Sequence, residues 1–126
     1  MVRQRNPFFS LQVGGAETEA DECTALQPLL CLGREIRDFA DTAAIIAQLN
    51  LVICVDTAVA HVAGALGVAC WLMLPQTAVD WHWHRTGSGS PWYPNDMYLF
   101  RQREAGWPAL ISDVRDALAD ITQGAR

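Results

Sequence analysis

Two uninterrupted apolar runs, separated by a stretch of small residues, constrain the fold of this chain more than any other feature. The runs are residues 51–55 and 68–74. Continuous rather than alternating apolarity predicts strands that are covered on both faces, as in a parallel sheet. The residues between them predict a helix over 58–66 that ends at Gly67. A strand, a helix and a second strand form a parallel βαβ unit, which is almost always right-handed.

The flanking segments extend this unit into an α/β domain. Further strands are predicted over residues 8–13, 29–32 and 97–100. A helix over 42–49 is expected to follow Asp41 as its N-cap, and Asp38 and Asp41 together are interpreted as capping residues. We therefore expect one domain over residues 1–126, with a Rossmann-like parallel sheet of four to five strands flanked by helices.

The last helix is predicted to begin at Trp107. Its expected inner face holds five apolar residues, namely Leu110, Ile111, Val114, Leu118 and Ile121. Two segments are less regular. Residues 16–27 fit either a short helix or a loop, and residues 76–96 fit an aromatic, turn-rich loop.

Composition narrows the classes of partner. The net charge is −5, so the chain has no electrostatic reason to bind nucleic acid or an anionic membrane. No Cys-x-x-Cys pair occurs, and Cys54 and Cys70 sit inside apolar runs as small hydrophobic residues. No apolar stretch reaches the roughly 18 residues of a membrane span, and no signal peptide is recognised. A reducing cytoplasm is therefore the expected location.

The turn between the first apolar run and the small-residue helix is the main functional clue. Asp56 and Thr57 lie at the carboxyl end of a predicted parallel strand, where ligands gather in open α/β sheets. Thr57 can cap the helix, and the amides of residues 58–60 are expected to be unpaired donors at its positive dipole end. His61 can donate a further hydrogen bond. These features predict an anion site; an N-capped crossover helix that binds no ligand is the alternative.

Other polar features give weaker indications. The glycine pair at 14–15 lets a ligand approach the end of the first strand, or serves as a plain turn. His82 and His84 share a face if the segment is extended, but no third residue stands at a metal-ligand spacing, so no metal site is expected. The neighbouring Trp81 and Trp83 are expected to pack inward.

Four motifs, in order along the chain, resemble a known family. They are residues 38–43, 55–67, 90–94 (Ser-Pro-Trp-Tyr-Pro) and 99–102 (Leu-Phe-Arg-Gln). From about residue 8 to residue 121, the chain resembles the C-terminal half of bacterial glycosyltransferase-like proteins that often carry tetratricopeptide repeats. It is more distantly similar to the heptosyltransferases of glycosyltransferase family 9.

The resemblance implies the C-terminal half of a GT-B architecture, in which two Rossmann-like domains face each other and the C-terminal one binds the nucleotide-sugar donor. Heptosyltransferases meet the donor's phosphates with an Asp-Thr-Gly…His segment, and Asp56, Thr57 and His61 fall on those positions. The implied donor-binding set is Asp56, Thr57, Ala58, His61, Gln12 and Gly14. No metal or cofactor is expected, because helix ends and side chains neutralise the phosphate charge in that architecture.

Departures from the family pattern separate binding from catalysis. Ala58 replaces the usual glycine, and no Lys followed by Trp-Pro comes after the first strand. The N-terminal half, which usually supplies the acceptor site and the general base, is not part of this chain. We therefore expect donor binding, with sugar transfer only beside that missing half. The main alternative is a catalytically inactive interaction module associated with repeats, and a generic flavodoxin-like regulatory domain is a weaker one. An isolated half exposes an apolar cleft face, which favours self-association into a homo-oligomer.

Overall fold

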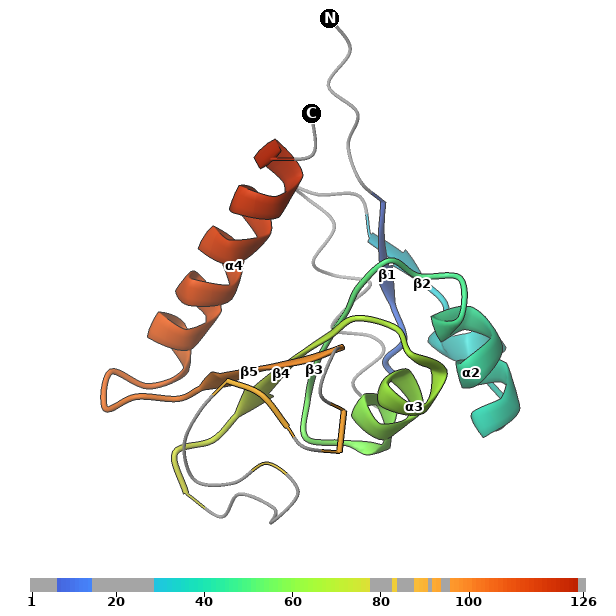
Figure 1. Ribbon diagram of the computed structural model, residues 1–126. Coiled ribbons are helices and arrows are strands. Elements are labelled where there is room, and N and C mark those ends of the chain that lie inside the picture. Colours follow the sequence, from blue (N-terminus) through green and yellow to red (C-terminus); the bar gives the residue numbers. More distant parts are fainter. Residues whose placement is uncertain are drawn as a thin grey trace, which may run out of the picture. The chain divides into compact units, whose positions relative to one another are not determined.

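The α/β class predicted from the sequence is confirmed, with parallel strands and flanking helices (Figure 1). The computed structural model describes residues 7–14, 29–77, 83, 88–90, 92–93 and 96–124. In chain order the elements are β1 (Phe8–Ser10), β2 (Leu29–Cys31), a 3-10 turn (Gly33–Glu35), α2 (Phe39–Ile46), β3 (Val52–Val55), α3 (Ala58–Leu66), β4 (Cys70–Leu74), β5 (Met97–Arg101) and α4 (Trp107–Gly124). The chain divides into two compact units, residues 1–45 and 46–126.

The first unit holds the parallel pair β1–β2, with Phe8 opposite Leu29. Its helix α2 is capped by the two carboxylates that the sequence indicated, although their roles differ from the prediction. Asp38 Oδ1 accepts the Asp41 N–H at 2.9 Å, and Asp41 Oδ2 accepts the Arg37 N–H at 2.9 Å. Asp38 is therefore the residue in the N-cap role, and Asp41 stands three residues inside, where a side chain can reach back beyond the helix end.

The second unit contains a three-stranded parallel sheet in the order β3–β4–β5. Val52, Cys70 and Met97 stand side by side across it, and α3 forms the crossover from β3 to β4. In Figure 1, α3 lies on one side of these strands and α4 rises on the other. The βαβ unit predicted from the two apolar runs is thus present, with strands shorter than expected at their first residues.

The two faces of this sheet are not equally covered, which corrects the expectation from continuous apolarity. On one face Leu72 and Leu99 are buried, at 0% and 3% exposure. On the opposite face Tyr98 is 48% exposed. Its ring and that of Trp71 both pack against Phe100, with centroid separations of 4.9 and 5.4 Å. The apolar residues on this second face are therefore explained by contacts among aromatic rings, although the face is partly exposed to solvent.

The helix α4 begins at Trp107 as predicted, but its buried stripe is narrower than the sequence pattern suggested. Leu110 and Val114 are buried, whereas Ile111 and Ile121 are 56% and 49% exposed. Ile111 points about 100° away from Leu110 around the helix, so the two cannot both lie at the centre of one face. Figure 1 also shows the second half of α4 extending away from the strands, which accounts for the exposure of Ile121.

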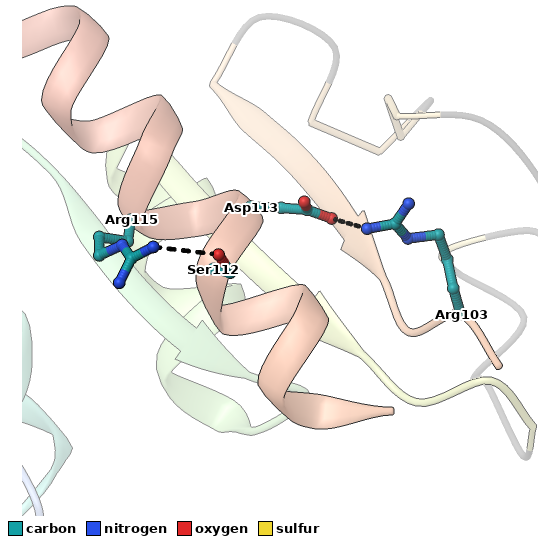
Figure 2. A network of polar contacts seen from close by, with 4 residues as sticks. All are labelled: Arg103, Ser112, Asp113 and Arg115. Atoms are coloured by element: carbon teal, nitrogen blue, oxygen red, sulfur yellow. Dashed lines mark hydrogen bonds and ion pairs between the residues drawn. The ribbon is translucent and has the colours of Figure 1, made fainter. Parts of the chain in front are cut away.

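Two polar contacts lie at the surface near the start of α4, and one of them joins the helix to the segment that follows β5. Figure 2 shows the guanidinium of Arg103 donating to the carboxylate of Asp113 at 2.8 Å, and Arg115 donating to the Ser112 hydroxyl at 3.2 Å. The Arg103 and Asp113 side chains are 64% and 46% exposed. Ion pairs this exposed contribute little, roughly 0–1 kcal/mol, so apolar burial carries most of the docking of α4.

Two cysteines meet inside the second unit. The Sγ atoms of Cys54 on β3 and Cys70 on β4 lie 3.7 Å apart as free thiols. The hydrogen bond to Cys54, together with burial, raises the pKa of the Cys70 thiol. This thiol therefore stays protonated and acts as a small core residue, as the sequence indicated. In the part of the chain that the structure describes, no helix is long and apolar enough to cross a membrane.

Candidate functional site

The site is built on the turn from β3 into α3. Asp56, Thr57 and Ala58 follow the carboxyl end of β3 and are all exposed. Thr57 holds the N-cap position with an extended backbone, φ −141° and ψ 172°, yet its hydroxyl makes no cap hydrogen bond. The predicted capping role of this side chain is thus not realised, and the hydroxyl stands beside the helix end without being used to close it.

Fewer backbone amides are available to a ligand at this helix end than the sequence predicted. The Ala60 N–H bonds the Thr57 carbonyl oxygen at 3.1 Å, which tightens the first turn. This bond corrects the prediction of unpaired donors at residues 58–60. The amides of Ala58 and Val59 stand ahead of the first helical acceptor, so they are the two donors best placed for an anion.

Small residues position α3 closely within its unit. Ala60 and Ala63 are completely buried. The helix ends at Gly67, as predicted, because its backbone is left-handed at φ 70° and its N–H closes on the carbonyls of Ala63 and Gly64. A crossover helix of only nine residues is thereby fixed at both ends, and its N-terminus is held at the carboxyl edge of the sheet.

His61 projects from α3 into an aromatic group formed by the segment between β4 and β5. Its Nδ1 atom lies 3.0 Å from the Tyr93 hydroxyl, and its ring stacks on Trp83 with a centroid separation of 5.2 Å and an interplanar angle of 29°. Trp83 is completely buried, in agreement with the inward packing expected of it. The imidazole is half-buried, and Trp83 and Tyr93 both contact it.

A cation lies close to this aromatic group. Arg101, the last residue of β5, donates from its guanidinium to the backbone carbonyl of Trp83 at 2.5 Å. Partial burial lowers the pKa of Arg101, although a guanidinium stays charged under ordinary conditions. The sequence reasoning assigned no site role to Arg101 or Tyr93. Both fall in motifs that the sequence singled out, residues 90–94 and 99–102, which was the available signal.

The predicted site residues divide between the two units. Asp56, Thr57, Ala58 and His61 lie in the second unit, where Asp56 and Thr57 precede α3 and Ala58 and His61 belong to its first turn. Gln12 and Gly14 lie in the first unit, just after β1, and both are exposed. The Gln12 N–H lies 3.4 Å from the Ser10 hydroxyl oxygen, and Gly14 has a φ of +88° that favours glycine. Their donor-binding role stays a prediction.

The described residues hold no group of three or more His, Cys, Asp or Glu side chains arranged for a metal ion. His82 and His84 lie outside the described residues, as do Trp81 and the acidic segment 16–27. The helix end and the hydroxyl of Thr57 are groups of the described structure that suit an anion.

Comparison with protein families gives one match. Residues 16–70 match the family described as Glycosyltransferase family 9 (heptosyltransferase). The matched part includes β2, α2, β3 and α3, and therefore the whole turn from Asp56 to His61. It supports a glycosyltransferase-like relationship, in agreement with the resemblance seen in the sequence. Neither curated proteins nor solved structures give a match.

Proposed function

We propose that this chain is a donor-binding domain of a glycosyltransferase-like protein, and that it binds the diphosphate of a nucleotide sugar at the N-terminus of α3. The observation that carries the proposal is the turn itself. An exposed Asp-Thr-Ala sequence follows a parallel strand and opens a helix, inside the segment that matches glycosyltransferase family 9. Helix N-termini at this edge of α/β sheets are ready anion sites.

Each group has a distinct role in the proposed complex. The amides of Ala58 and Val59 and the hydroxyl of Thr57 donate to phosphate oxygens at the positive end of the helix dipole. His61 adds a donor from one turn further along. Asp56 accepts hydrogen bonds and carries negative charge, so it suits a sugar or ribose hydroxyl rather than a phosphate. Gln12 and Gly14 enter the proposal through the family resemblance alone.

Donor binding and sugar transfer make different demands on this chain. Sugar transfer would need stabilisation of the departing diphosphate, which the α3 terminus can provide, together with an acceptor site and a general base. The family resemblance assigns the last two to a second Rossmann-like half. The chain by itself is therefore expected to bind the donor without turning it over, and no metal is assigned to the bound state.

Titration calorimetry with UDP, ADP, GDP and their sugars tests the proposal. Binding by at least one member is expected, and Thr57→Val and His61→Ala should each weaken it about three- to tenfold, the loss of one hydrogen bond. Thr122→Val is the matched control, because Thr122 is exposed on α4 and donates only within its own helix. It should leave the affinity unchanged.

Two results would contradict donor binding. One is the absence of any heat change at millimolar ligand with protein that is shown to be folded. The other is binding that Thr57→Val and His61→Ala leave intact. Either result would favour the alternative of an interaction module associated with repeats, which is supported by the lack of the family's Lys after the first strand.

A further inference from the structure

Two aromatic residues from a distant part of the second unit contact the imidazole of His61. His61 and Gly64 belong to α3, and Trp83 and Tyr93 come from the segment between β4 and β5. The Tyr93 hydroxyl lies 3.0 Å from His61 Nδ1, and the tyrosine ring meets the imidazole edge-on at 6.0 Å between centroids. The Trp83 and Tyr93 rings are themselves 6.2 Å apart. The imidazole is therefore held by stacking on one side and by a hydrogen bond at its edge.

Tyr93 is held in this position by a tight turn. The Tyr93 N–H bonds the Ser90 carbonyl oxygen at 3.2 Å, a hydrogen bond typical of a tight turn. The Trp92 N–H donates to the Ser90 hydroxyl oxygen at 3.3 Å, and only 3% of the surface of Ser90 is exposed. Ser90 thus bonds the backbone amides of both Trp92 and Tyr93, and these two bonds help to place the tyrosine.

The helix leaves room for this tyrosine at Gly64. A Cβ atom at Gly64 would lie 2.5 Å from Cδ1 of Tyr93, a separation that atoms in contact do not reach. Gly64 is one turn from His61 on the same side of α3, so the ring that covers the glycine also reaches the imidazole. Glycine in a helix interior costs about 1 kcal/mol relative to alanine, and here the cost is offset by the contact with Tyr93.

We infer that Tyr93 is a positioning residue that fixes the tautomer and the ring orientation of His61. The tyrosine hydroxyl donates to Nδ1 of the neutral imidazole, which keeps the proton on Nε2. If the imidazole gains a proton, the same hydroxyl oxygen accepts from Nδ1–H instead. In both forms Nε2 carries a hydrogen and is the nitrogen that donates to an anionic oxygen.

This inference deepens the proposed function and rests on it for the identity of the anion, a diphosphate. The assignment of the tautomer does not rest on it, because it concerns the chain without ligand. The two parts can therefore be tested separately.

The first test is an NMR measurement of the imidazole nitrogens in ¹⁵N-histidine-labelled protein, at a pH high enough that the spectra no longer change. His61 is assigned from the signals that disappear in His61→Ala. The expected result is a single tautomer with the proton on Nε2 in the wild type, and a mixture of tautomers in Tyr93→Phe.

Phenylalanine keeps the ring over Gly64, so the thermal midpoint of Tyr93→Phe should change little. A proton on Nδ1 in the wild type, or tautomers unchanged by Tyr93→Phe, would overturn the inference, and the wild-type result decides even if the variant is unstable.

The second test adds ADP or UDP, whichever the wild type binds more tightly. Tyr93→Phe should weaken binding about three- to tenfold, and Tyr93→Phe combined with His61→Ala should be no weaker than His61→Ala alone. If His61→Ala weakens binding and Tyr93→Phe does not, the positioning role fails while the proposed function stands. If the tautomers behave as expected but the wild type binds neither nucleotide, the proposed function fails and the positioning role stands.

Discussion

At the scale of single residues, the contact between Gly64 and Tyr93 gives a prediction with a change of sign. Gly64→Ala should destabilise the wild type by about 1–2 kcal/mol, because the new methyl group displaces the tyrosine ring and this overpacking outweighs the gain in helix propensity. In a Tyr93→Ala background the clash is gone. The same substitution should then stabilise the chain by about 0.5–1 kcal/mol, the ordinary helix preference for alanine.

Urea unfolding of the four proteins in this double-mutant cycle measures the effect. The cycle isolates the interaction because both residues touch one another and neither substitution adds a polar group. An equal effect of Gly64→Ala in the two backgrounds would show that the tyrosine does not rest on the glycine in solution.

The sequence predicted only part of this candidate site. Asp56, Thr57 and His61 could be selected from the sequence because a strand end, a capping residue type and a helix start are local signals. The bond between His61 and Tyr93 joins residues 32 positions apart, and no local pattern encodes it. The use of Asp38 rather than Asp41 as the N-cap was missed for a smaller reason, since both residue types suit that position equally.

At the scale of elements, the stop of α3 at Gly67 can be tested without touching the site. Gly67 has a φ of +70°, and a Cβ there would meet only Asp96 Oδ2 at 3.8 Å, an ordinary contact. Gly67→Ala should therefore cost about 1 kcal/mol through backbone conformation alone, and Gly67→Asn should cost less, because asparagine tolerates the left-handed region. Equal losses in thermal unfolding for the two variants would argue that space, not backbone conformation, limits this position.

The elements themselves were largely predictable because their signals are local. The apolar runs gave β3 and β4, and Gly67 and Trp107 marked a helix end and a helix start. What failed was the burial of particular faces. Ile111 and Ile121 fit an apolar helical repeat, yet both are exposed, whereas Leu110 and Val114 of the same helix are buried. Which side of an element is covered depends on neighbours that are remote in sequence.

At the scale of the whole molecule, charge separates two ways of binding a phosphate. The chain carries 9 Lys and Arg residues against 14 Asp and Glu residues, so its overall field repels an anionic ligand. In the proposed function, a diphosphate is therefore bound by local donors at the end of α3 rather than by a basic surface. The match to glycosyltransferase family 9 covers the segment that holds these donors.

The central claim is that the amides and side chains at the start of α3 bind the diphosphate of a nucleotide sugar. Its most direct test is a two-dimensional ¹H–¹⁵N NMR titration of the folded chain with ADP, UDP or GDP. The account predicts saturable shifts that are largest for the amides of Ala58 and Val59 and for His61, and that need about three- to tenfold more nucleotide to saturate in Thr57→Val. Saturable shifts confined to other residues, or no shifts at millimolar nucleotide, would contradict it.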